Sequence, residues 1–340
     1  MKWADFAKKT WEKSPHPVLD VGPSGSWDDE MVDCPFVMAT QENSYKLFFT
    51  GHSRSSGDWG IGMAVSEDFK SWEKRADNPL IKSGDTGFWG RSIDGAAIVM
   101  FRGGYYLFFE AAAGGVPLQK LKYFFPPALR EMMGRVRRCC FSPQSQAVTH
   151  ASGRGIGIAQ SFDLVHWESM AGHPVFMPQG PAFREARGIF SPCPCVMDDR
   201  LYLFYGVSNG KTVSTHLSTS TDLAAWQRRP EIILEPGPTD SWDEGSVIIV
   251  SILALEDAYV AFYEGQDRKN QYAVGMAVSQ DCIHWKKHEQ NPVLARGRPG
   301  DKDEMTVNSP HVFKTKKDIF LFYGARDSKM RGRCMMARLR

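Results

Sequence analysis

Acidic side chains recur at one position of a pattern that the sequence repeats five times. Aligned on neighbouring residues, the copies hold at this position Asp33, Asp94, Phe190, Glu244 and Asn308. Carboxylates are costly to bury unless they are paired or used, and two of them together can donate and accept a proton. We therefore expect Asp33, Asp94 and Glu244 to be catalytic. Glu185, shortly before Phe190, is a fourth candidate acid.

Polar and aromatic residues surround these positions in the sequence. Arginine and carboxylate groups hydrogen-bond sugar hydroxyls, and tryptophan packs on the apolar face of a sugar ring. The residues that we expect to bind substrate are Trp27, Asp28, His52, Trp89, Arg91, Arg187, Phe190, Trp242, Asn308 and Arg326. The Ser-Trp-Asp pattern recurs at Trp27 and Trp242, which favours a structural role for Asp28, and Arg187 would equally serve to neutralise a neighbouring acid.

A second motif shows which elements must position these residues. Ser-x-Asp-x-x-x-Trp ends at Trp72, Trp167, Trp226 and Trp285, and Trp11 is the remnant of a fifth copy. An aromatic segment such as Leu47–Gly51 precedes each motif, and aromatic runs bounded by glycine are typical of strands. Self-similarity at an interval of about 60 residues indicates stacked units or a closed ring.

The repeats predict an all-β fold, a five-bladed β-propeller with four strands per blade. We expect a single domain over residues 1–340. The last repeat lacks its outer strand, and residues 11–19 have the sequence of one. An N-terminal strand that completes the last blade would close the ring without leaving an exposed edge.

One repeat carries an insertion, residues 114–152 in blade 2. Within it Leu129, Met132, Met133 and Val136 follow the spacing of an apolar helix face. We expect a helical lid over the substrate site. A dimer contact, and a helix that binds a membrane surface or a partner, are the alternatives.

Composition limits the classes of function. The net charge of +2 gives no overall footprint for nucleic acid, and the sequence holds neither a leader-like segment nor an apolar run long enough to span a membrane. Seven cysteines, an odd number, predict free thiols and a cytoplasmic protein. No cofactor motif is present, although calcium at the axis, near Asn308 or His311, stays open.

The whole chain resembles the propeller superfamily of glycoside hydrolase families 32, 43, 62, 68 and 130. The resemblance lies in Gly22–Asp29, Val32–Pro35, the aromatic strands, the Ser-x-Asp-x-x-x-Trp motif and segments such as Asn291–Leu294. It implies that Asp33 is the base and that Asp94 orients the sugar and tunes the acid. The third-blade glutamate that serves as acid in family 43 has no counterpart, because Phe190 holds its place, so the resemblance leaves Glu244 or Glu185 to donate the proton.

These features predict a glycoside hydrolase or transglycosylase that acts on a small glycoside, with a furanosyl group as the expected sugar. A phosphorylase like those of family 130 is one alternative, with Arg91, Arg187 and Arg268 as its phosphate clamp. A propeller repurposed for acid–base chemistry on a hydrophobic small molecule, such as cyclisation, is another. The last is a non-catalytic module that binds sugars. The expected partner is thus a small molecule or an oligosaccharide.

Overall fold

A computed structural model describes residues 1–41, 44–85, 92–112, 154–170, 176 and 188–340 of the chain. The insertion 114–152, with its predicted helical lid, lies outside these ranges. So do four of the predicted site residues: Trp89, Arg91, Glu185 and Arg187. The described residues contain one short helix, α1 (Trp3–Phe6), and are otherwise almost entirely strands and turns.

The strands form five antiparallel meanders of four strands, and each meander is one blade. Blade 1 contains β2 (Met31–Gln41), β3 (Ser44–His52), β4 (Trp59–Ser66) and β5 (Glu73–Lys74), and β6 (Ile81–Lys82) also pairs with β4. Blade 2 contains β7 (Ser92–Phe101), β8 (Gly104–Ala112), β9 (Arg154–Ser161) and β10 (Glu168–Ser169). Blade 3 contains β11 (Gly188–Met197), β12 (Arg200–Ser208), β13 (Val213–Ser220) and β14 (Gln227–Arg228).

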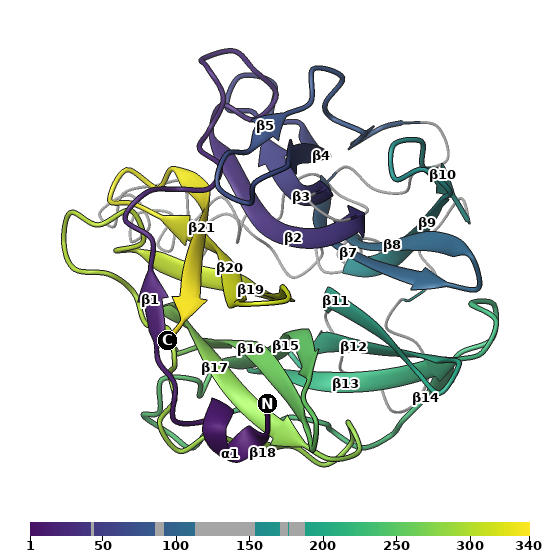
Figure 1. The fold of residues 1–340 in the computed structure, drawn as a ribbon, viewed down its shortest axis with the longest axis vertical. Helices are drawn as coiled ribbons and strands as arrows, with labels where there is room; N and C mark the ends of the chain where they lie inside the picture. Colours follow the sequence, from purple (N-terminus) through teal and green to yellow (C-terminus); the bar gives the residue numbers. More distant parts are fainter. Residues whose placement is uncertain (42–43, 86–91, 113–153, 171–175, 177–187) are drawn as a thin grey trace, which may run out of the picture.

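The last two blades follow the same order. Blade 4 contains β15 (Ser246–Ala254), β16 (Tyr259–Gln266), β17 (Tyr272–Ser279) and β18 (Lys286–Lys287). Blade 5 contains β19 (Thr306–Lys314), β20 (Ile319–Arg326), β21 (Gly332–Leu339) and β1 (Trp11–Lys13). The N-terminal strand therefore completes the last blade, as predicted, with Trp11 opposite Leu339. Figure 1 shows the blades arranged around a central axis, with the first strand of each innermost.

The tryptophan of each repeat packs against the aromatic strand of the preceding blade. Ring centroids lie 5.6–6.2 Å apart in the pairs Trp167–Phe48, Trp226–Phe108, Trp285–Phe204, Trp11–Phe262 and Trp72–Phe322. Each edge-on aromatic pair contributes about 0.5–1.5 kcal/mol beyond its buried area. The last pair joins blade 1 to blade 5, so the same contact runs through every neighbouring pair of blades.

The serine and aspartate of the motif build the turn that carries this tryptophan. In blade 1 the amide of Phe69 donates to Ser66 Oγ at 2.9 Å, and the amides of Lys70 and Ser71 donate to Asp68 Oδ1 at 2.8 Å. Phe69 has a φ of 63°, and its equivalents in the next three motifs are also left-handed. The repeated motif is therefore a capped turn and has a structural role.

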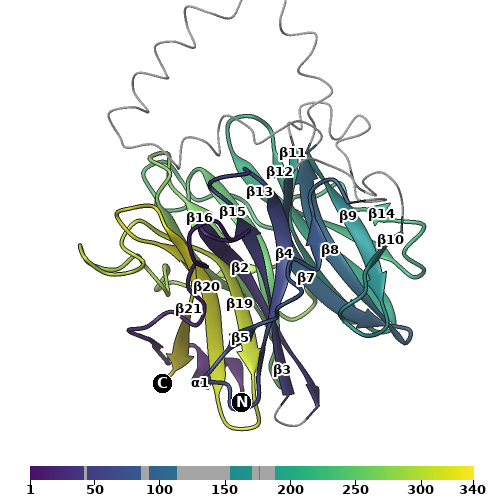
Figure 2. The same cartoon turned by 90° about the horizontal axis from the view of Figure 1, so that it is seen from above.

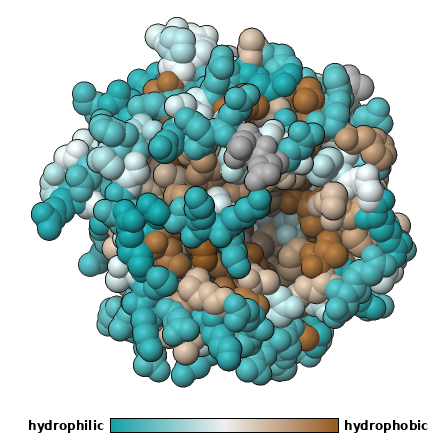
Figure 3. Space-filling view, in the orientation of Figure 1, coloured by the Kyte–Doolittle hydropathy of each residue, from teal (hydrophilic) through white to brown (hydrophobic). Residues whose placement is uncertain are grey.

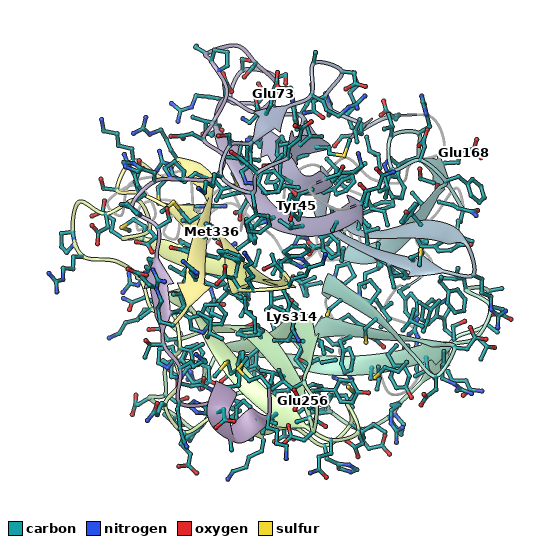
Figure 4. The ribbon with its side chains drawn as sticks, in the orientation of Figure 1. Tyr45, Glu73, Glu168, Glu256, Lys314 and Met336 are labelled. Carbon is teal, nitrogen blue, oxygen red and sulfur yellow. The ribbon has the colours of Figure 1, made fainter. Side chains whose placement is uncertain are left out.

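The inner strands run through the thickness of the molecule, which Figure 2 shows from the side. Figure 4 places Lys314, the last residue of β19, near the centre of its view, and Glu73 and Glu168 at the periphery on β5 and β10. Figure 2 is seen from above, so its lower edge is the side that faces the viewer in Figures 1 and 4; the turn that follows β19 lies there, and this side is the face where the inner strands end. On this face apolar residues gather around a central hollow within a polar rim (Figure 3). The predicted catalytic positions lie near the opposite ends of the same strands.

Candidate functional site

A β-bulge interrupts the inner strand at the predicted axial position. The residue after this position has a left-handed backbone in four blades, with φ of 52° at Cys34, 66° at Gly95 and 47° at both Ser191 and Ser309. The strand register shifts at these same points. An L side chain at positive φ is strained, so the surrounding structure must hold it there.

A polar residue on the second strand of the preceding blade accepts the amide of three of these bulges. Thr50 Oγ1 accepts from Gly95 N at 3.0 Å, Glu110 Oε2 from Ser191 N at 3.2 Å, and Glu264 Oε2 from Ser309 N at 2.9 Å. Each bond crosses from one blade to the next at the axis. The carboxyl groups of Glu110 and Glu264 therefore lie in the region where the catalytic acids were expected.

The register of blade 4 corrects the alignment made from the sequence. Ile248 faces Glu264 as Asp33 faces Thr50, so Ile248 and not Glu244 holds the axial position. The alignment of Glu244 was wrong because Gly245 resembles Gly95, although it lies before the strand begins. Glu244 accepts the amide of Asp240 at 3.1 Å and pairs with Arg268 at 3.2 Å.

The same turn occurs in two other blades and explains the Ser-Trp-Asp pattern. Asp29 accepts the amide of Gly25 at 2.9 Å, and Glu304 accepts that of Gly300 at 2.7 Å. Glu244 is the equivalent residue of blade 4, which makes it a turn cap. This arrangement leaves Asp33 and Asp94 as the predicted acids that do lie on inner strands.

Asp28 and the two tryptophans belong to the body of the blades. Asp28 is 3% exposed and pairs with Lys74 at 2.5 Å, and Asp243 pairs with Lys287 at 2.6 Å. Trp27 stacks on Phe49 with centroids 5.5 Å apart, and Trp242 stacks on Tyr263 at 5.6 Å. Repetition of these contacts in blades 1 and 4 supports the structural interpretation over substrate binding.

Asp33 is the most enclosed of the axial acids, with 2% of its surface exposed. Arg326 Nη2 lies 3.3 Å from Oδ2, Asn308 Nδ2 lies 3.4 Å from both oxygens, and the amide of Cys34 donates to Oδ1 at 2.8 Å. Gly324 packs so closely that a Cβ there would lie 1.8 Å from Oδ1. The structure thus brings together three predicted site residues, Asp33, Asn308 and Arg326.

Asp94 is half-buried and has a different environment from Asp33. The Cys34 thiol donates to its Oδ1 at 3.5 Å, and the same sulfur lies 3.4 Å from Ser309 Oγ. Because Asp94 is more open to water than Asp33, it is better placed to exchange a proton with a ligand.

Phe190 forms an apolar sector of the site beside a charged pair. The guanidinium of Arg154 lies 5.3 Å from the centre of its ring and pairs with Glu110. A cation over an aromatic face is attracted by the negative face of the ring, so Arg154 and Phe190 fix one another. An aromatic surface next to hydrogen-bonding groups is suited to the apolar face of a sugar.

Glu264 has the most perturbed acid–base behaviour of these groups. Burial, with the nearby carboxyls of Asp33, Glu110 and Asp94, raises its pKa from 4.5 to about 7. The Ser309 amide opposes this rise only in part. Although its side chain keeps some contact with water, Glu264 lies deep among protein atoms and exchanges its proton near neutral pH.

His52 was predicted to bind substrate, and in the structure it contacts the side chains of Glu30 and Trp59. Its Nδ1 lies 3.1 Å from Glu30 Oε2, and its ring packs on Trp59 at 4.5 Å. The bond from His52 is the main reason why the pKa of Glu30 is lowered. These contacts belong to the edge of blade 1, beside the entrance of its inner strand.

The sequence places Glu110 and Glu264, at the ends of second strands, on the same face as the expected acids, but neither was among the expected site residues, and Arg154 was missed. A signal was present, because the five aromatic strands contain Phe-Phe-Thr, Phe-Phe-Glu, Phe-Tyr-Gly, Phe-Tyr-Glu and again Phe-Tyr-Gly, and only two of these carry an acid. The strand register is needed to interpret this pattern, because only the register shows that this position faces the bulge of the next blade.

Metal binding was left open in the sequence. Among the residues that the structure describes, no group of three or more His, Cys, Asp or Glu side chains is arranged to hold an ion. His311 Nε2 lies 2.8 Å from the Val37 carbonyl, and Asn308 donates to Asp33. Neither supports the calcium alternative.

The described part of the chain also holds no helix able to cross a membrane.

Comparison with solved structures places the fold among enzymes that act on glycosidic bonds. A glycoside hydrolase shares the fold with a TM-score of 0.70 at 14% identity, over 96% of this chain and 92% of that one. Beta-1,2-mannobiose phosphorylase from Listeria innocua gives 0.65 at 12%, over 96% of each chain. A third, from the GH130 family of mannoside phosphorylases that contains glycoside hydrolases targeting β-1,2 mannosidic linkages in Candida mannan, gives 0.66 at 14%, over 96% and 93%.

The class defined by fold and site is therefore a propeller of the glycoside hydrolase type. A family model narrows it: the chain belongs to glycoside hydrolase family 130, whose model, described as beta-1,4-mannooligosaccharide phosphorylase, matches residues 99–339. A search of curated protein sequences finds no match.

Proposed function

We propose that the protein cleaves a β-mannosidic linkage in a small mannooligosaccharide, with Glu264 as the proton donor. The descriptions of the family model and of two structural relatives name mannosides as substrates. Mannose in such oligosaccharides is a pyranose, so the expectation of a furanosyl group was wrong. Membership of a glycoside-cleaving family also favours cleavage over cyclisation or binding alone.

The observation that carries the proposal is the position of the Glu264 carboxyl, enclosed by protein atoms near three other acids, which raises its pKa to about 7. Oε2 accepts the Ser309 amide, which leaves Oε1 to hold the proton. As the bond from the anomeric carbon to the leaving oxygen breaks, that oxygen takes the proton and Glu264 becomes a carboxylate. A donor with a pKa near the working pH suits this step, and general acid catalysis contributes about 10²–10⁴-fold.

We assign Asp94 the role of the general base that activates the attacking water. Both oxygens of Asp33 are engaged by Arg326, Asn308 and the amide of Cys34, so Asp33 is suited to orienting a sugar hydroxyl. Asp94 is more exposed and can accept the proton of an attacking water. This exchanges the two roles that the superfamily resemblance implied.

Charge within the described part of the axial site, which does not include the predicted clamp residues Arg91 and Arg187, favours water over phosphate as the nucleophile. Within the described part of the axial site, Asp33, Asp94 and Glu110 face two guanidinium groups, those of Arg154 and Arg326. With Glu264 protonated, the formal sum is one negative charge, which repels a phosphate dianion. Phosphorolysis is the second candidate, because the family model is described as a phosphorylase.

Product analysis with β-1,4- and β-1,2-mannobiose, with and without phosphate, tests the proposal. We expect mannose from both halves of the substrate, and Glu264→Gln to lower kcat by about 10²–10⁴-fold. Glu244→Gln is the matched control, because this turn cap should leave kcat near the wild-type value. Mannose 1-phosphate formed only with phosphate would establish phosphorolysis instead. Full activity of Glu264→Gln would refute the role of Glu264.

A further inference from the structure

Ser309 has no role in the reaction proposed above, yet it contacts several members of the axial site. Its amide donates to Glu264 Oε2 at 2.9 Å. Its hydroxyl accepts from Asn308 Nδ2 at 3.1 Å and lies 3.4 Å from Cys34 Sγ. Asn308 in turn donates to Asp33, and Cys34 donates to Asp94. One serine is thus linked to three acids, which come from blades 1, 2 and 4.

The donors and acceptors of this network can be ordered in one direction. Cys34 donates its only proton to Asp94, so the proton between Cys34 and Ser309 must come from the serine hydroxyl. Asn308 is a donor to the same hydroxyl oxygen. The order is therefore Asn308 to Ser309 to Cys34 to Asp94, and bonds in such a chain strengthen one another.

The backbone of Ser309 is strained, so the surrounding structure must hold this residue in its conformation. Its φ of 47° is left-handed, where glycine is favoured, and Gly95 occupies the equivalent bulge of blade 2. Cys34 and Ser191 also hold a side chain at this strained position, and among the described residues Ser309 differs from Ser191 in the hydrogen bonds of its hydroxyl. Its hydroxyl is the group that glycine would lose.

We infer that Ser309 is a positioning residue that fixes the carboxyls of Asp33, Asp94 and Glu264 relative to one another. The inference rests on the proposed function, in which the last two of these groups exchange protons with substrate and water. A misplacement of about 1 Å in such a group costs about 10²-fold in rate. A lost hydroxyl therefore lowers kcat, whereas KM changes less, because Asp33, which orients the sugar, keeps its direct contacts with Arg326 and the Cys34 amide.

The first experiment compares Ser309→Ala with Ser309→Gly. Both lose the hydroxyl, but only glycine relaxes the left-handed backbone, so it separates the side chain from backbone strain. We expect kcat to fall by about 10–100-fold in both variants with KM within about threefold of wild type. Equal or higher thermal stability of the glycine variant would show that it folds. Wild-type kcat in that variant would overturn the inference.

The second experiment does not depend on turnover, so that failure of the proposed function can be told apart. Iodoacetamide alkylation of Cys34 is followed by mass spectrometry of its peptide. A hydroxyl that donates to sulfur stabilises the thiolate, and its loss should slow alkylation by about fivefold, the equivalent of one hydrogen bond. Asp94→Asn should accelerate alkylation, since it removes a neighbouring negative charge. An unchanged rate in both serine variants would overturn the inference even if no mannoside is cleaved.

Discussion

Glu264 should make the stability of the protein fall as pH rises. The rise in its pKa from 4.5 to about 7 corresponds to about 3 kcal/mol, since each pH unit of difference is worth about 1.4 kcal/mol. Below about pH 4.5 the group is protonated in both folded and unfolded chains and has no effect. Between the two values the unfolded chain loses the proton first, which favours unfolding, and above about pH 7 the whole penalty is present.

Replacing Glu264 with glutamine removes this penalty, because the amide cannot ionise. We expect the free energy of unfolding of Glu264→Gln to match that of wild type at about pH 4. It should exceed the wild-type value by up to about 3 kcal/mol at about pH 8. The value is an upper limit, because Glu264 keeps some contact with water.

Urea unfolding followed by tryptophan fluorescence, at a series of pH values, measures this difference. The matched control is Asp29→Asn: the Gly25 amide lowers the pKa of this turn cap, so its stabilisation is already complete above about pH 4.5 and its difference from wild type should not grow between about pH 4.5 and about pH 7. A gap between Glu264→Gln and wild type that stays constant with pH would refute the argument that burial and neighbouring acids raise the pKa of Glu264. So would a wild-type protein that gains stability over this range relative to the variant.

Two further predictions concern the glycine beside Asp33 and the strand that completes the ring. Gly324→Ala should lower kcat by about 10²-fold, since its Cβ would lie 1.8 Å from Asp33 Oδ1. Gly206→Ala at the equivalent position of blade 3 meets the apolar side chains of Ile248 and Val213, the nearest atom at 2.8 Å, and should be milder; steady-state kinetics of both variants check this, and equal losses would contradict it. Deletion of residues 1–13 removes β1 and the fully buried Phe6, so the free energy of unfolding should fall by at least about 3 kcal/mol in urea titrations, and an unchanged value would show that β1 does not hold blade 5.

Much of the fold could be predicted because the repeats encode local chemistry. The Ser-x-Asp-x-x-x-Trp motif is a turn whose bonds span at most five residues, so its spacing alone reveals the blades. The completing strand followed from counting strands in the last repeat. These features depend on short-range contacts that any single copy displays in the sequence.

The acids of the site were predicted less completely, because their positions depend on strand register. Asp33 and Asp94 lie beside a Pro or Gly that marks the bulge, and both were selected. Blade 4 has no such mark, and the glutamate-glycine pair Glu244-Gly245, four residues before Ile248, was taken for it. Glu264 was visible as the end of a strand, but its role comes from a bond to the next blade, which no local pattern contains.

The bonds from second-strand residues to neighbouring bulges also bear on how the protein folds. Glu264 comes from blade 4 and holds the backbone of blade 5, and Asp94 comes from blade 2, so no isolated blade contains both of the groups assigned to proton transfer. The site exists only once neighbouring blades have docked, and blade 5 docks with a strand from the start of the chain. Recovery of activity during refolding would then report completion of the ring, later than the signals of individual sheets. The enzyme would have no partly assembled form able to cleave a glycoside.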